Sequence, residues 1–181
     1  MSTYVFDAEW KVADRADIVL DAQHLWCVVF KELGKDNYQT FTMDTQENDT
    51  MKEWLNSHTN ITLIGHNIIN ADLEVFRRLL GVDFTVGPDT ICGNSCTFID
   101  TYTMSKRNNP DRSAAYLWDP VKKKNISLGV HGLGAWAKRV GSAKHIVTDW
   151  STQPIEVYLE RCKGDVDDNE AAYYMMLEER E

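Results

Sequence analysis

The stretch Tyr4-Val5-Phe6-Asp7-Ala8-Glu9 decides the fold: its apolar residues predict a strand that ends in two carboxylates placed one residue apart. Side chains at positions i and i+2 of a strand project from the same face, so Asp7 and Glu9 are expected to point together. Two carboxylates held together repel each other unless a positive charge lies between them. Hard divalent cations with oxygen ligands, Mg2+ or Mn2+, supply that charge. For the pair taken alone, the alternative is a solvated strand end.

Beyond this strand, hydrophobic periodicity and turn residues predict four more strands. They are expected at 25–30, 38–43, 61–64 and 96–101, with hairpin turn residues at 34–37. Helices are expected at 51–57, 71–80, 132–140 and from Ser151-Thr152-Gln153-Pro154 onward, with Gly81 and Gly141 as C-terminal caps. The polar stretch 107–127 predicts a long loop. The sum is an α/β fold with a mixed five-stranded sheet flanked by helices.

The size of the chain permits one domain over residues 1–181, because 43% hydrophobic content can fill one core. Met1-Ser2-Thr3 leads directly into the first strand, which predicts no secretory signal and favours a complete small gene product. No apolar run approaches the length that spans a bilayer, so no membrane partner is expected.

The four cysteines suit a reducing compartment, and a cytoplasmic location is expected. Cys92 and Cys96 are separated by Gly-Asn-Ser, which is typical of a loop. A zinc site needs four ligands at a recognisable spacing, and only this one pair is available, so no zinc site is expected.

The net charge of −9 argues against broad, sequence-independent coating of nucleic acid. It leaves open an enzyme that grips only a few nucleotides. Basic residues gather in the central third of the chain, among them Lys122-Lys123-Lys124. These lysines are either a solvated face or a rim that contacts phosphates.

Two more acids extend the pair on the first strand. Asp72 lies near the start of a predicted helix, where the helix macrodipole alone would favour a carboxylate. Asp165 lies in an acidic run, where surface charge is the alternative. Together with Asp7 and Glu9, they make the four acids that a site for two cations ~3.5–4 Å apart requires.

These residues also carry a family resemblance over nearly the whole chain. Asp7-Ala8-Glu9, His66-Asn67 with Asp72, and Cys162-x-x-Asp165-Val166 resemble, in order, the three motifs of the DnaQ-like, or DEDD, 3′–5′ exonucleases. The likeness is closest to the proofreading domains of phage family A DNA polymerases. Connecting segments are similar as well, at 99–101, at 131–141, and at Lys144 and Asp149-Trp150.

The resemblance implies a ribonuclease H-like fold and hydrolysis of terminal phosphodiesters at a 3′ end, with two Mg2+ or Mn2+ ions. It implies that Asp7 bridges both metals, that Glu9 and Asp165 complete one site, and that Asp72 holds the second metal. It also makes Asn67 a candidate contact to the substrate strand. His66 is either a satisfied polar residue at a strand end, the preferred interpretation, or a phosphate contact. Trp10 is core or a stacking surface for a terminal base.

One position departs from the family pattern. Members carry a Tyr four residues before the last acid or a His five before it, and that side chain orients the attacking water. Here the two positions are Arg161 and Glu160. A residue four before Asp165 shares its helix face, so Arg161 is expected to project towards the metals as a candidate catalytic residue. A guanidinium cannot act as a base at neutral pH, but it can hold the scissile phosphate or pair with the acids.

Three functional interpretations follow. The first is a stand-alone 3′–5′ exonuclease on single-stranded DNA, phage-encoded and so found in the cytoplasm of an infected bacterial host, or proofreading in trans with a separate DNA polymerase chain. The second keeps the chemistry but changes the substrate to RNA or short oligonucleotides. The third is a catalytically weak accessory subunit of a polymerase that binds DNA ends, and Arg161 is the residue that favours it.

Overall fold

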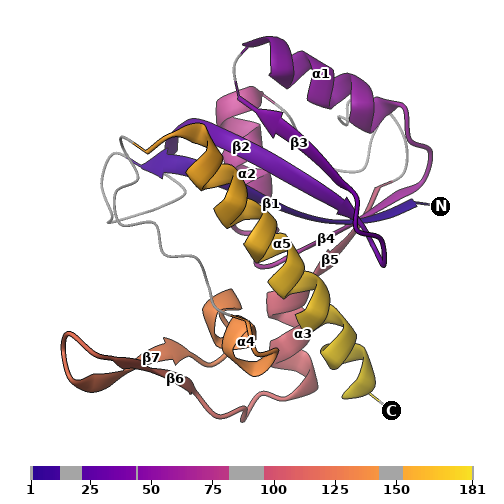
Figure 1. The fold of residues 1–181 in the computed structure, drawn as a ribbon. Coiled ribbons are helices and arrows are strands. Elements are labelled where there is room, and N and C mark those ends of the chain that lie inside the picture. Colours follow the sequence, from indigo (N-terminus) through magenta and orange to yellow (C-terminus); the bar gives the residue numbers. More distant parts are fainter. Residues whose placement is uncertain (1, 13–21, 44, 82–95, 143–152, 181) are drawn as a thin grey trace.

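The computed structural model describes residues 2–12, 22–43, 45–81, 96–142 and 153–180 (Figure 1). Its central sheet has the order β3-β2-β1-β4-β5. The strands are β1 (Ser2–Val12), β2 (Ala22–Glu32), β3 (Tyr38–Thr42), β4 (Ile61–Gly65) and β5 (Cys96–Asp100). β1, β2 and β3 pair antiparallel, whereas β4 pairs parallel with both β1 and β5. The predicted mixed five-stranded sheet is therefore confirmed.

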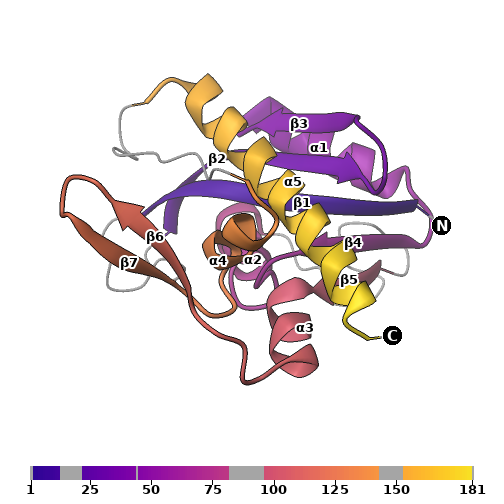
Figure 2. The same ribbon diagram turned by 60° about the horizontal axis from the view of Figure 1, so that its bottom comes forward.

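Helices cover both faces of this sheet. They are α1 (Thr45–Asn56), α2 (Asp72–Leu80), α3 (Thr101–Asn108), α4 (Leu133–Arg139) and α5 (Ile155–Glu178). The long helix α5 crosses one face, and α1 and α2 lie on the other (Figures 1 and 2). Gly81 caps α2 with φ 63°, and its N–H bonds to the carbonyl of Phe76, as the sequence predicts. The last helix begins at Ile155; the predicted cap residues Ser151 and Thr152 lie outside the described residues.

The alternation of side chains along β1 separates two apolar clusters. Phe6 and Ala8 are buried in the cluster on the α1 and α2 side. Val5 points the other way and packs with Cys162 and Val166 of α5. Asp7 and Glu9 are two and four residues after Val5, so their side chains lie on the same face of the sheet as Val5, the face on which α5 lies.

The predicted loop over 107–127 is wrong. Helix α3 continues to Asn108, and β6 (Ala115–Asp119) pairs antiparallel with β7 (Lys124–Gly129) as a separate hairpin. An isolated two-stranded ribbon is exposed on both faces, so neither face has to be apolar. The alternation of apolar and polar residues that indicates a strand is therefore missing from its sequence. Asp119 organises the turn, because its Oδ1 accepts from the N–H groups of Val121 and Lys122.

Several sequence expectations fall outside the described residues: Cys92 and the connectors Lys144 and Asp149-Trp150. Across the described residues, none of the helices combines the length and apolar character needed to cross a membrane.

Candidate active site

Three acids converge where β1 meets α5. Carboxylate oxygens of Asp7, Glu9 and Asp165 all lie within 4.8 Å of one another. Glu9 and Asp165 are buried and Asp7 is half-buried. The helix is held against the strand next to this cluster by the Cys162 thiol, which donates to the carbonyl of Asp7 at 3.2 Å. Burial raises the pKa of Cys162, so the thiol keeps the proton that it donates.

The sheet topology explains why the acids gather here. β1 pairs with β4 only over Ser2–Val5, whereas β4 ends at Gly65 beside Asp100 of β5. Asp7 and Glu9 therefore extend past the carboxyl end of the parallel strands. In open α/β sheets, this edge is where ligands bind.

Asp72, the first residue of α2, lies against the same edge. It is 3% exposed, and the N–H of Ala8 donates to its carboxylate. Its Oδ1 is buried and has no hydrogen-bond partner among the described residues. Burial, with smaller contributions from the charges of Asp100 and Asp165, raises its pKa to about 7. A nearby cation would stabilise the ionised form of a carboxylate that is buried with one oxygen lacking a hydrogen bond.

The turn between β4 and α2 is held by Asp100, which is not among the predicted site residues. Its carboxylate accepts from the N–H groups of Asn67 at 3.1 Å and Ile69 at 3.3 Å, and it also caps α3. The available signal was the place of Asp100 in the connecting segment 99–101, which resembles the family, and its acid type, which is typical of a helix N-terminus. Gly65 opens the turn, and a Cβ there would lie 1.8 Å from Cγ2 of Ile68, so only glycine fits without rearrangement.

His66 and Asn67 occupy this turn. Nδ1 of His66 lies 3.0 Å from Oγ1 of Thr101, which gives this one ring nitrogen a polar partner. Whether His66 is a satisfied polar residue or a phosphate contact stays a prediction. Asn67 adopts a left-handed φ of 62°, and its side-chain oxygen is 3.4 Å from Nδ2 of Asn70. A role of Asn67 at a substrate strand stays a prediction.

The remaining predicted nucleic-acid contacts lie on other surfaces. Trp10 is partly buried and packs against the cluster on the α1 and α2 side, in agreement with the core interpretation. Lys122, Lys123 and Lys124 are exposed at the tip of the hairpin, which contacts α4.

Arg161 lies among the acids, as its helical spacing predicts. One guanidinium nitrogen is 2.6 Å from Oδ2 of Asp165, and its Nε donates to Oε1 of Glu9 at 3.3 Å. The side chains of all three residues are almost completely enclosed, at 11% exposure or less. The guanidinium therefore supplies positive charge to two of the clustered carboxylates.

Tyr158 does not replace the missing water-orienting residue. It is 1% exposed and its ring stacks on Trp26 at 4.9 Å between centroids, on the second apolar cluster. Its hydroxyl accepts from the backbone N–H of Gln153 at 3.3 Å. Two helical turns before Asp165, this phenol serves packing.

The site has the donor chemistry of a hard divalent cation. The clustered ligand atoms are all carboxylate oxygens. Asp72 is not one of the three clustered acids, but its charge interacts with that of Asp165 and its buried Oδ1 has no hydrogen-bond partner among the described residues. Like charges this close need a counter-charge, which Arg161 provides only in part. The residues present therefore fit Mg2+ or Mn2+.

Comparisons with known proteins support the fold. No protein-family model matches the chain, and no curated protein matches its sequence. The structure is similar to a family B DNA polymerase from the hyperthermophilic archaeon Pyrobaculum calidifontis, with a TM-score of 0.62 and 11% identity, covering 98% of this chain and 24% of the polymerase chain. It is also similar to E. coli exonuclease I in complex with a dT13 oligonucleotide, with a TM-score of 0.56 and 12% identity, covering 96% of this chain and 40% of that chain.

The chain thus spans less than half the length of either protein. Identities this low establish shared architecture and not shared activity. The mixed sheet with its flanking helices has the ribonuclease H-like fold found in these exonuclease and polymerase structures.

Proposed function

We propose that this chain is a metal-dependent 3′–5′ exonuclease that hydrolyses terminal phosphodiesters of single-stranded DNA. The observation that carries the proposal is the convergence of Asp7, Glu9 and Asp165, with carboxylate oxygens within 4.8 Å of one another. The comparisons support it in that a similar structure is that of an exonuclease, exonuclease I, in complex with a dT13 oligonucleotide. The motif likeness to the proofreading domains of phage family A polymerases extends the proposal to a phage-encoded enzyme that acts alone or in trans with a polymerase chain.

The chain's own residues would divide the work. Asp7, Glu9 and Asp165 would hold one Mg2+ or Mn2+ ion, and Asp7 with Asp72 would hold the second. Two such cations activate a water and stabilise the leaving oxygen. Asn67, in the turn held by Asp100, would contact the substrate strand near the acids.

Arg161 would have to leave at least one carboxylate when the acids bind metal. Its guanidinium remains charged at any pH at which the enzyme works, and it offers donors only. The group is suited to hold a phosphate oxygen of the terminal nucleotide. It is not suited to take a proton from the attacking water.

Strand degradation tests the proposal. The full chain, with Mg2+ or with Mn2+, is expected to shorten a 5′-labelled single strand of DNA one nucleotide at a time from its 3′ end, and EDTA is expected to stop it. Asp7→Ala should abolish shortening while leaving the fold intact, and Asp36→Ala, an exposed acid of the β2–β3 turn, is the matched control. Retained activity in Asp7→Ala, or no shortening with either metal, would contradict the assignment. Comparing the rate on this DNA strand with the rate on an RNA strand of the same sequence decides whether RNA is the substrate instead.

A second function is favoured by one observation: Arg161 already pairs with Glu9 and Asp165. If the guanidinium keeps these partners, the chain would bind DNA 3′ ends as a catalytically weak accessory subunit of a polymerase. Tight binding of single-stranded DNA without shortening, with both metals, would support that alternative.

A further inference from the structure

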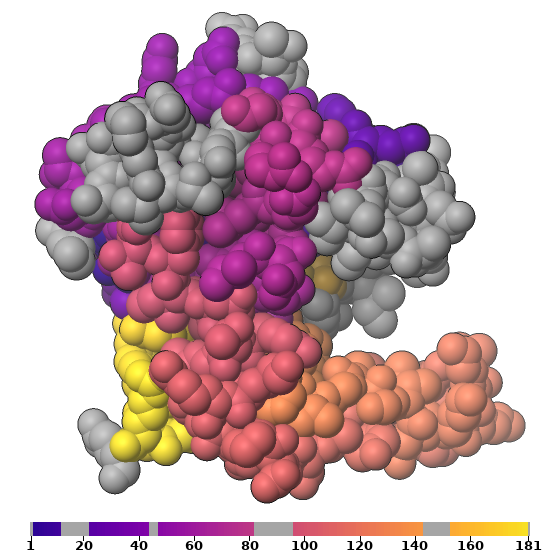
Figure 3. Space-filling view, turned by 180° about the vertical axis from the view of Figure 1, so that it is seen from behind, coloured from indigo at the N-terminus to yellow at the C-terminus, as the bar shows by residue number. Residues whose placement is uncertain are grey.

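The hairpin formed by β6 and β7 is a surface that the active site does not explain. Figure 3 shows it as an arm that projects from the body of the molecule. It carries four of the large apolar side chains that are exposed on the described surface: Tyr116 at 55%, Leu117 at 39%, Trp118 at 58% and, in the turn, Val121 at 88%. Exposed aromatic residues concentrated on one element indicate a binding surface.

The strand alternation places the two aromatic rings on one face of the hairpin. Tyr116 and Trp118 are two residues apart on β6, so they share a face, and Leu117 lies on the other. Their cross-strand partners are Ser127 and Asn125, both exposed. Residues i and i+2 of a strand are about 6.8 Å apart, about twice the ~3.4 Å spacing of successive nucleotides in a stacked strand. We call Tyr116, Trp118, Asn125 and Ser127 the aromatic face.

The positive charge at the tip of the hairpin favours a negatively charged ligand. Lys122, Lys123 and Lys124 follow Trp118 within one turn and are all exposed, in a chain whose net charge is −9. The one acid of the hairpin, Asp119, accepts from the backbone N–H groups of Val121 and Lys122, and those hydrogen bonds lower its pKa. Its other oxygen lies 3.8 Å from Nζ of Lys122, so one acid faces three lysines at the tip. Lys123 has a φ of 47°, which sets the bend of the tip. Rings beside a cationic tip complement the bases and phosphates of one polynucleotide strand.

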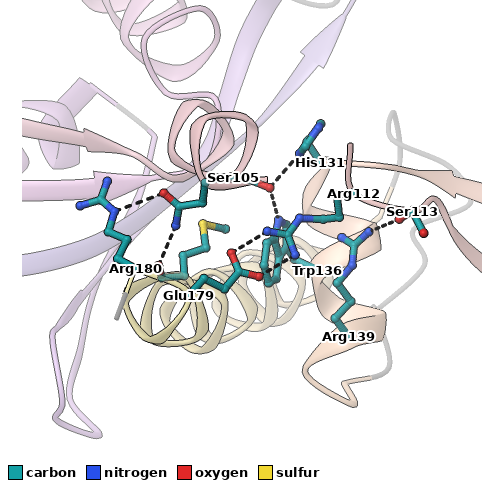
Figure 4. A network of polar contacts seen from close by, with 10 residues as sticks. Ser105, Arg112, Ser113, His131, Trp136, Arg139, Glu179 and Arg180 are labelled. Atoms are coloured by element: carbon teal, nitrogen blue, oxygen red, sulfur yellow. Dashed lines mark hydrogen bonds and ion pairs between the residues drawn. The ribbon is translucent and has the colours of Figure 1, made fainter. Parts of the chain in front are cut away.

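The root of the hairpin is fixed to α4 and to the end of α5, the helix that carries Asp165 (Figure 4). Arg112, just before β6, donates from two guanidinium nitrogens to the carboxylate of Glu179, each at 2.6 Å, and lies 4.5 Å above the ring of Trp136. Arg139 of α4 covers the same ring and donates to the carbonyl of Ser113 at 2.7 Å. This clamp joins the hairpin to α4 and to the region just beyond α5.

The other end of the hairpin is fixed as well. Oγ of Ser105 lies 2.9 Å from Nδ1 of His131, just after β7, and accepts from Nε1 of the fully buried Trp136 at 3.1 Å. Burial, together with the charges of Arg112, Lys106 and Arg139, lowers the pKa of His131, so a neutral ring can accept from the serine. The arm therefore has a rigid base and an exposed aromatic face.

We propose that this aromatic face is a second binding site for single-stranded DNA, on which bases stack while the tip lysines contact phosphates. The inference rests on the proposed function, because it adds a distal contact for the strand whose 3′ end reaches the acids. A strand too short to reach the hairpin gains nothing from it. The site therefore contributes to affinity for long strands and to retention of the strand between cleavages.

Anisotropy of fluorescein-labelled dT4 and dT16, measured in EDTA so that the strands stay intact, tests the site. The double variant Tyr116→Ala with Trp118→Ala is expected to weaken dT16 binding by about 5- to 100-fold and to leave dT4 binding unchanged. Tyr116→Phe with Trp118→Phe keeps the rings and should bind dT16 like the wild type. Tyr174→Ala removes an aromatic ring that is 43% exposed on α5 and is the matched control.

Circular dichroism establishes that each variant is folded, and the single variant Trp118→Ala replaces the double variant if the latter unfolds. If the wild-type chain and a folded double variant bind dT16 equally well, this proposal alone is overturned. The aromatic face would then be a surface for contact with a protein. A wild-type chain that binds neither strand, with or without Mg2+, would overturn the proposed function together with it.

Discussion

The guanidinium of Arg161 lies 2.6 Å from Oδ2 of Asp165, one helical turn further along α5. The same side chain reaches across to Glu9 on β1, at 3.3 Å from Nε to Oε1. A single cation on the helix thus joins the carboxylates of two elements. Arg161 is therefore expected to affect two measurable quantities: the stability of the metal-free protein and the rate of the proposed hydrolysis.

Arg161→Tyr is expected to raise the rate of hydrolysis while leaving the fold intact. A phenol can orient the attacking water, whereas a guanidinium has only donors that are already engaged by the acids. Positioning of this kind contributes ~10²–10⁴-fold in rate. Single-turnover rates on the same DNA strand measure it, with Arg161→Phe as the control that has the ring but no hydroxyl. An arginine form that is already fast, or a tyrosine form that is no faster, would show that the water is positioned by another group.

Arg161→Gln is expected to make the stability of the protein depend on metal. Without the guanidinium, Glu9 and Asp165 lose their counter-charge in an enclosed site, and breaking such a pair costs about 3 kcal/mol. Mg2+ or Mn2+ should restore the loss, since a ligand that binds only the folded state stabilises it. Urea midpoints in EDTA and in Mg2+ measure both effects. Arg77→Gln breaks a surface pair with Glu74 and should cost much less, because solvent screens exposed charges. Equal losses in the two variants would contradict the prediction.

Asp72 is expected to make the metal-free protein less stable as pH rises. Its folded pKa, about 7, lies above the ordinary value of 3.8, so the folded state holds the proton more tightly than the unfolded state does. This contribution to stability is complete below pH ~4 and is lost as pH rises towards ~7, and each pH unit between the two pKa values corresponds to about 1.4 kcal/mol. Asp72→Asn should flatten the fall in urea midpoint between pH 5 and pH 8 in EDTA. Asp36→Asn, in an exposed turn, should leave the fall unchanged, and an equal fall in Asp72→Asn would refute the expectation.

Gly65→Ala is expected to destabilise the turn that leads from β4 to α2. The new Cβ would meet Cγ2 of the fully buried Ile68 at 1.8 Å, and overpacking of this kind costs about 1–3 kcal/mol. Gly132→Ala is the matched control, because the nearest atom to its Cβ would be 3.8 Å away. Thermal melting of the two variants gives the comparison, and equal melting temperatures would show that the turn can relax around Ile68.

The tip lysines are expected to contribute to DNA affinity through charge. Replacing Lys122, Lys123 and Lys124 together by Ala should weaken binding of dT16 at low salt and flatten the dependence of affinity on salt. Each lost phosphate contact lowers the slope by about 0.7 for a single strand. Lys35→Ala with Lys52→Ala removes two lysines that pair with acids on other surfaces and serves as the control. If affinity and slope are both unchanged, the cluster is a solvated face.

Much of the fold is encoded locally. The apolar alternation in β1 and β2, the turn residues of 34–37 and the left-handed glycine that ends α2 are each local features, so the sequence predicts the five strands and most helices. The hairpin of β6 and β7 escaped prediction because its exposed ribbon carries polar and apolar residues on both faces. Its stability comes from α4 and from the clamp between Arg112 and Glu179, which are 67 residues apart.

The candidate site shows the same division. The spacing of Asp7 and Glu9 by itself determined that the two carboxylates share a face, and the spacing of Arg161 and Asp165 determined that they share a helix face. Only the tertiary structure decided that these faces meet, that Asp100 holds the turn of His66 and Asn67, and that Asp72 is buried with a raised pKa. Spacing along a chain sets direction within one element, whereas burial and charge pairing depend on how distant elements pack, which no local pattern encodes.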